Sequence, residues 1–200
     1  MSLLLLLAYP LVSHFSVMTG YPVWSVMYLL GIFGVFFIKA IVTRKHYLVL
    51  IMACVLIVGV ALVLQEQSKV IMYLPPIMIN LGLLYIFGRS LERDQVPLIT
   101  RYAEIIDGTL NQEIKRYTKR VTIAWTILFL IMLIESIGLA LFASEEIWSL
   151  FTNFINYGVV ILMFIAEYLY RYTVYPNLPK RSFFQFLSLI VNIRPSQLRT

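Results

Sequence analysis

Apolar runs about as long as a membrane is thick dominate this chain. They cover residues 3–17, 23–42, 47–64, 70–87, 121–142 and 148–170. A helix of roughly 20 residues crosses the ~30 Å hydrocarbon core of a bilayer. Only 13% of the 200 residues are charged, whereas soluble domains carry about 25%. The sequence therefore predicts an all-α membrane protein with six transmembrane helices.

The first apolar run, Leu3 to Val17, is short for a span and contains Pro10. A secretory signal peptide is the competing interpretation. Against it, Met1 and Ser2 carry no side-chain cation and no small-x-small cleavage site follows the run. We therefore expect a retained first helix that is kinked at Pro10, since a tilted helix or a locally thinned bilayer tolerates this length.

Charge divides the chain into four blocks. Residues 1–87 hold the first four predicted spans, 88–120 a polar loop of 33 residues, 121–171 the last two spans, and 172–200 a tail. If both ends of the chain share one side, fifteen of the sixteen Lys and Arg residues fall on that side, and only Lys69 falls on the other. Because cations are retained on the cytoplasmic side, we predict cytoplasmic termini and a cytoplasmic loop.

A short amphipathic helix is predicted within the loop, from Pro97 to Asp107, and Gly108 is expected to end it. Its apolar face consists of Leu98, Ile99, Tyr102, Ile105 and Ile106. The loop has no aqueous core in which to bury this face. The face therefore either lies along the membrane surface, with Arg101 near anionic headgroups, or packs on the cytoplasmic ends of the spans.

Two other polar-region segments also have a predicted structure: the start of the next helix and part of the tail. Thr109, with Gln112 three residues later, fits a capping box for a helix that continues into the fifth span. Residues 183–193 of the tail are rich in Phe and Leu, and they are open to the same two interpretations as the loop helix.

Polar side chains at membrane depth form a first group of candidate site residues. On the sixth run, positions three or four residues apart share one stripe: Asn153, Asn156, Val160, Phe164, Glu167 and Arg171. The stripe should face the helix bundle, because lipid does not solvate amides or charges. Glu135 on the fifth run lies at a depth similar to that of Asn156, so these two side chains are expected to meet, and His14 and Asn80 are candidates to join them.

This intramembrane cluster has two interpretations. As a functional site it is a polar pocket, or a proton-accepting carboxylate, open to the outer leaflet. As a structural feature it is interhelical hydrogen bonding that contributes ~0.6–2 kcal/mol per bond. Gly31 and Gly34 in the second run predict another structural feature, a close approach by a neighbouring helix of this chain or of a second copy in a homodimer.

Charged side chains in and beside the loop form the second group of candidates. They are Arg89, Arg101, Arg116, Lys119, Arg120, Glu167 and Arg171. The loop itself holds seven cations and five acids. Glu167, Arg171 and Arg120 either form an interfacial salt bridge or belong to a site for a lipid headgroup or an acyl carrier protein.

Familiar catalytic motifs are missing. Neither His14 nor His46 has an acid four or five residues later, and the chain has no Gly-rich phosphate loop and no Gly-x-Ser-x-Gly elbow. Cys54 stands alone, and no His, Cys and carboxylate residues show metal-ligand spacing. We therefore expect no metal and no cofactor, and we favour a non-catalytic protein. Short basic loops account for the net charge of +6, so no nucleic-acid partner is expected.

Several motifs in the second half of the chain together resemble a known family. They are Gly88-Arg-Ser-Leu, Pro97-Leu-Ile-Thr-Arg101, Tyr117-Thr-Lys-Arg-Val-Thr-Ile-Ala-Trp125, Trp148-Ser-Leu-Phe-Thr-Asn153, Asn156-Tyr157, Glu167-Tyr-Leu-Tyr-Arg171 and Pro176. Over roughly residues 70 to 180 the chain resembles small multi-span inner-membrane proteins of Gram-negative bacteria. That family is encoded in aryl polyene and xanthomonadin-type clusters beside acyl carrier proteins, ketosynthases, dehydratases and acyltransferases. The resemblance implies a membrane context for acyl-carrier-linked lipid assembly or export, and it implies no reaction and no catalytic residue.

Three functions remain open from the sequence. The leading one is an inner-membrane accessory protein that docks soluble acyl-carrier machinery at the cytoplasmic face, in contact with membrane lipids. The second is a component of a lipid or polyene exporter or flippase that uses the intramembrane polar cluster. The third is a membrane acyl or glycosyl transferase, which the missing motifs disfavour.

Overall fold

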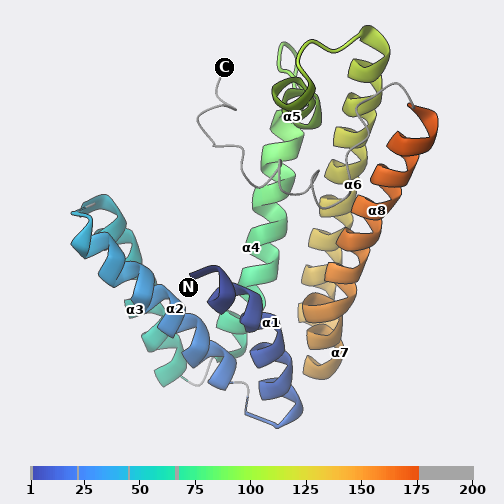
Figure 1. Cartoon of the computed structure of the whole chain (residues 1–200). Coiled ribbons are helices and arrows are strands. Elements are labelled where there is room, and N and C mark those ends of the chain that lie inside the picture. The colour runs from blue at the N-terminus through green and yellow to red at the C-terminus, as the bar shows by residue number, and fades with distance from the viewer. Residues whose placement is uncertain (1, 22, 45, 66–67, 176–200) are drawn as a thin grey trace. The chain divides into compact units, whose positions relative to one another are not determined.

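The computed structural model describes residues 2–21, 23–44, 46–65 and 68–175, and these residues form helices joined by short turns (Figure 1). Along the chain the elements are α1 Ser2–Met18, α2 Val23–Val42, α3 His46–Leu64, α4 Ser68–Arg89, α5 Leu98–Asp107, α6 Gln112–Phe142, α7 Glu145–Leu150, the π-helix η1 Phe151–Ile155, and α8 Asn156–Val174. The predicted tail segment 183–193 lies outside the described residues.

Five helical stretches are long and apolar enough to cross a membrane. They are Val23–Val42, His46–Leu64, Lys69–Arg89, Gln112–Phe142 and Glu145–Val174. The first predicted span does form a helix that contains Pro10, but α1 has only 17 residues and is not among the five. The all-α, multi-span prediction is therefore confirmed for five candidate spans, and the sixth stays a prediction.

The helices divide into two units, and the division falls within α4, within α6 and near the start of α8. The first unit comprises residues 1–78 and 134–157, and the second comprises residues 79–133 and 158–200. In the first unit, α1 packs on α2 and α7, and α2 packs on α3. Its buried core consists of Val17, Val26, Ile71, Met72 and Trp148.

Close packing of α2 on α3 occurs at Gly59. A Cβ atom built on Gly59 would lie 2.5 Å from Leu30 Cδ2, so only glycine fits there without movement of the leucine. A Cβ atom built on Gly31 or Gly34 would meet nothing within 4 Å. The prediction that these two glycines admit a neighbouring helix is therefore wrong among the described residues of this chain. A contact with a second copy stays a prediction.

The core of the second unit is a row of large side chains on α6. Its buried members recur every three or four residues: Tyr117, Val121, Trp125, Phe129 and Met132. Phe87 from α4 meets Phe129 with ring centroids 5.1 Å apart, and Phe164 from α8 meets Trp125 at 4.7 Å. This aromatic core joins α4, α6 and α8 within the second unit.

The loop between α4 and α6 follows the prediction in outline and corrects it in one detail. α5 ends at Gly108, whose φ of +78° suits glycine and whose N–H donates to the Glu104 carbonyl. The capping box at Thr109 is wrong, because α6 begins at Gln112 and the Asn111 side chain accepts from the Ile114 N–H at 2.8 Å. Asn111 therefore stands directly before the first turn of α6, where a capping side chain reaches the free N–H groups.

Candidate functional site

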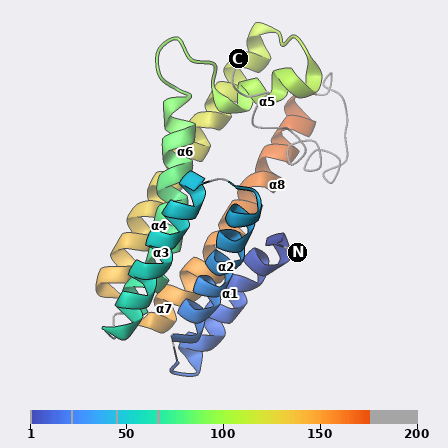
Figure 2. The ribbon, with the colours of Figure 1, turned by 90° about the vertical axis from the view of Figure 1, so that its left-hand side faces the viewer.

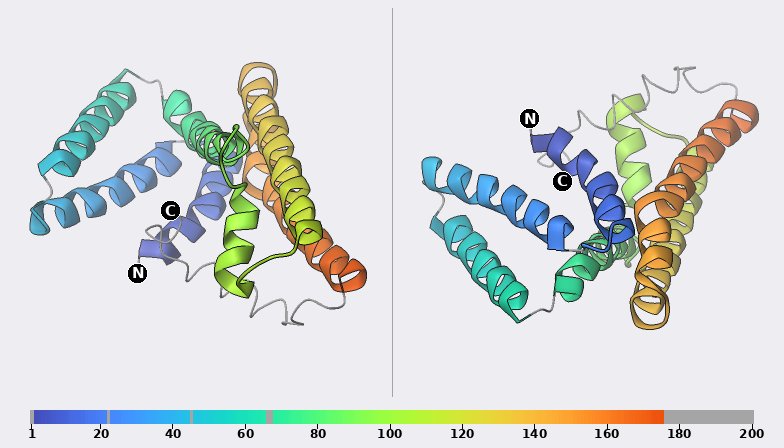
Figure 3. Two further views of the ribbon diagram at one scale, coloured as in Figure 1. Left: turned by 90° about the horizontal axis from the view of Figure 1, so that it is seen from above. Right: turned by 90° about the horizontal axis from the view of Figure 1, so that it is seen from below.

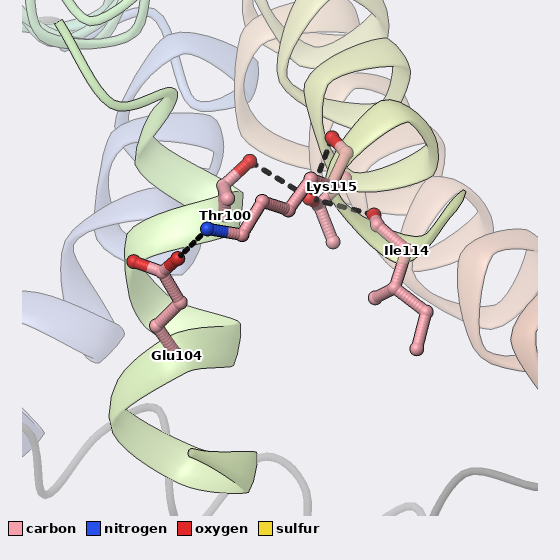
Figure 4. Close-up of polar contacts among 5 residues, drawn as sticks. Thr100, Glu104, Ile114 and Lys115 are labelled. Atoms are coloured by element: carbon pink, nitrogen blue, oxygen red, sulfur yellow. Dashed lines mark hydrogen bonds and ion pairs between the residues drawn. The ribbon is translucent and has the colours of Figure 1, made fainter. Parts of the chain in front are cut away.

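α5 and the first turns of α6 (residues 98–107 and 112–122), here called the platform, are joined by threonine hydroxyls. Thr100 and Thr118 are buried, and their Oγ1 atoms lie 2.7 Å apart (Figure 4). The Thr122 hydroxyl, fully buried, accepts from the Ile99 N–H at 3.2 Å. A free N–H at the start of α5 and two hydroxyls are thereby satisfied away from water, which fixes how α5 lies on α6.

Two ion pairs hold the other end of α5. Asp107 Oδ2 and Arg171 Nη2 from α8 are 2.6 Å apart, and their side chains are only 4% and 17% exposed. Lys115 Nζ of α6 lies 2.8 Å from Glu104 Oε1 in a more open position (Figure 4). Sequence reasoning missed Asp107 as a site residue. The sequence places Asp107 on the side of the loop helix away from its apolar face, and nothing else in the sequence distinguishes it. This is the side that packs on the protein.

The charged residues predicted as site candidates differ in their exposure and in their contacts. Arg116, Lys119 and Arg120 are exposed on α6. Arg89 is exposed at the end of α4, where Nη1 donates to the Tyr85 hydroxyl at 2.7 Å and the guanidinium lies 5.8 Å from that ring. Arg101 is half-buried on α5. The structure thus distributes these cations over the platform and the adjoining end of α4.

Glu167 lies one turn before Arg171 on α8, half-buried beside the Trp125 indole and within electrostatic range of Arg171 and Tyr117. The Tyr117 hydroxyl is buried and has no hydrogen-bond partner in the described part of the chain. Arg171 therefore lies between two acids: it is ion-paired with Asp107 of α5 and is close to Glu167 of its own helix. On the platform itself, burial raises the pKa of the Tyr102 phenol above its usual value.

The intramembrane candidates of the first unit form two separate groups of polar contacts. His14 Nδ1 lies 3.0 Å from Ser149 Oγ, and Asn153 Nδ2 donates to the same Ser149 oxygen at 3.0 Å and to Ser13 Oγ at 3.5 Å. Asn156 hydrogen-bonds the Glu135 carboxyl, so the predicted meeting of these two side chains is confirmed. Asn80 is buried in the second unit.

Sequence reasoning missed Ser13 and Ser149, which lie at the centre of this hydrogen-bonded group. Both are fully buried, so Ser149 with His14 does not form a nucleophile open to a substrate. Asn153 lies in η1, where one wider turn interrupts the helix that leads into α8. Single π-turns of this kind are frequent at functional sites, but here the polar groups bond chiefly to one another.

No group of three or more His, Cys, Asp or Glu residues that could hold a metal ion occurs among the residues placed by the structure. Cys54 is exposed and free. The five candidate spans indicate a multi-pass membrane protein. No family model, curated protein or solved structure matches this chain.

Proposed function

We propose that this chain is an integral inner-membrane accessory protein that docks acyl-carrier-linked lipid or aryl polyene biosynthesis at the cytoplasmic face. The observation that carries the proposal is the exposed cationic surface at the start of α6. Arg116, Lys119 and Arg120 lie within five consecutive residues of one helix, all exposed. Acyl carrier proteins are acidic, and complementary charge speeds encounter and orients a partner.

Ion pairing within the second unit strengthens this surface. The loop of residues 88–120 has seven cations and five acids. Two of those acids are neutralised in the structure, Glu104 by Lys115 and Asp107 by Arg171, which lies outside the loop. Removing the Glu104–Lys115 pair and then Asp107 leaves six cations and three acids, so the net charge of the remaining groups rises from +2 to +3.

The test is salt-dependent capture of an acidic acyl carrier protein by the full-length chain in detergent or nanodiscs. Joint replacement of Arg116, Lys119 and Arg120 by Glu should abolish capture at low salt. Joint replacement by Gln, which removes the charges but keeps polar side chains and helix propensity, should give intermediate capture with a weaker salt dependence. Equal capture by all three proteins, or no capture by the natural chain at low salt, would overturn the proposal.

A second function rests on a different observation, the polar side chains that hydrogen-bond one another inside the first unit. A hydrogen-bonded carboxyl such as Glu135 at membrane depth is a recurrent feature of lipid and ion pathways. In a lipid or polyene exporter or flippase component, joint replacement of Glu135 and Asn156 by Leu stops export while synthesis continues. Unchanged export by the folded variant removes this candidate.

Lipid mass spectrometry of a deletion strain separates the three functions. Loss of an accessory docking protein should leave precursor on the carrier. Loss of an exporter should instead accumulate free lipid inside the cell. Loss of an acyl or glycosyl transferase should remove one defined product and accumulate its acceptor.

A further inference from the structure

α5 is attached to the rest of the second unit by its polar side. Thr100 and Ala103 are the buried residues of this helix, and Asp107 continues the same side to its pair with Arg171. In a water-soluble protein, an amphipathic helix packs on the core through its apolar face. Here threonine hydroxyls and a buried ion pair make the attachment.

The apolar edge on the other side of α5 is formed by Leu98, Tyr102 and Ile105. These positions are three or four residues apart, so they share one face of the helix, turned well away from Thr100 and Ala103. Ile105 is 37% exposed, and Leu98 and Tyr102 are half-buried. Ile99, at the margin of the apolar face, packs against the aromatic core of the second unit.

The level of α5 along α6 shows what lies beside this edge. α6 has 31 residues and is ~46 Å long, which exceeds the ~30 Å hydrocarbon core of a bilayer. Its apolar run begins at Val121, and α5 meets it at Thr118 and Thr122. α5 therefore lies where α6 enters the hydrocarbon, and it runs crosswise to α4 and α6 (Figures 2 and 3).

We propose that α5 lies in the plane of the lipid headgroups, and that its edge Leu98–Tyr102–Ile105 enters the acyl-chain boundary of the adjacent leaflet. The occupant of this edge is the phospholipid monolayer of the membrane that the chain crosses. A helix bound to protein by its polar side and to lipid by its apolar side fixes the depth of the platform at the bilayer surface. This inference does not depend on which soluble partner binds the exposed cations.

The experiment places a nitroxide spin label on the full chain in nanodiscs of phosphatidylethanolamine and phosphatidylglycerol. Single cysteines replace Ile105 or Leu98 in a Cys54→Ser background, since Cys54 is otherwise free to react. Collision rates with oxygen, which concentrates in lipid, are compared with those of a water-soluble nickel chelate. Ile127→Cys, exposed within the apolar part of α6, is the lipid reference, and Glu113→Cys, exposed in its first turn, is the water reference.

The ratio of oxygen to nickel collision rates at Ile105 should approach that at Ile127 and exceed that at Glu113 several-fold. The label at Leu98 should give the same order, which guards against a local disturbance at one site. A ratio at Ile105 equal to that at Glu113 would overturn the proposal, because the edge would then face water. Low collision rates with both reagents would also overturn it, because the edge would then be covered by protein.

Discussion

At the scale of single residues, we expect the buried ion pair between Asp107 and Arg171 to be the polar contact of α5 whose loss destabilises the protein most. Taking two charges out of water is costly, and their attraction offsets this cost only while both partners are present. The pair joins α5 to α8, and its carboxylate is almost completely enclosed. The pair between Glu104 and Lys115 is about one-third to one-half exposed and should contribute far less.

Replacing Asp107 by Ala should lower the free energy of unfolding by about 3 kcal/mol, because the largely buried Arg171 guanidinium loses the carboxylate that lies 2.6 Å from it. Replacing Lys115 by Ala is the matched control and should cost less than about 1 kcal/mol. Unfolding by sodium dodecyl sulfate in mixed micelles measures both values. Equal losses for the two variants would show that burial does not distinguish the pairs.

At the scale of elements, sequence patterns predicted helices better than they predicted which residue or face makes each contact. The helix of the loop, its end at Gly108 and the continuation of α6 into an apolar span all follow from local periodicity and from turn chemistry. The glycine of the α2–α3 contact was missed, because the register between two helices depends on their mutual rotation. Gly59 and the predicted pair Gly31 and Gly34 carry the same local signal.

The start of α6 offers a direct test of its cap. Asn111→Ala should destabilise the protein by about 1 kcal/mol, because the Ile114 N–H loses its side-chain acceptor at 2.8 Å. Thr109→Ala, two residues earlier, should change stability by a few tenths of a kcal/mol at most, as an exposed substitution outside the cap. The same mixed-micelle unfolding measurement compares them, and a larger loss at Thr109 would restore the capping box.

At the scale of the whole molecule, the apolar runs and the distribution of Lys and Arg were the basis for predicting the spans and the topology. The long apolar helices follow from the length of the apolar runs, and Lys69, the only cation predicted on the far side, is ion-paired with Glu145. The partners of polar groups could not be read from the sequence. Ser13 and Ser149 are separated by more than 130 residues, and no periodicity links α1 to α7. Asp107 and Arg171 are similarly remote along the chain.

The number of spans determines the side on which the chain begins. If α1 crosses the membrane, a thiol label placed just ahead of it should lie on the same side as one at Glu113, in agreement with the predicted cytoplasmic termini. If α1 does not cross, the two labels lie on opposite sides. Reaction with a membrane-impermeant thiol reagent in intact cells and in inverted vesicles, in the Cys54→Ser background, distinguishes six spans from five.

The exposed cations and the aromatic core of the second unit belong to one uninterrupted helix. Between Gln112 and Met132, α6 contains neither proline nor glycine, and its backbone offers no hinge. A displacement of the turn that carries Lys119 and Arg120 should therefore also displace the aromatic side chains packed around Trp125. A soluble protein bound to this end of α6 would therefore be held at a fixed distance from the bilayer, because a continuous helix and not a flexible linker connects the two.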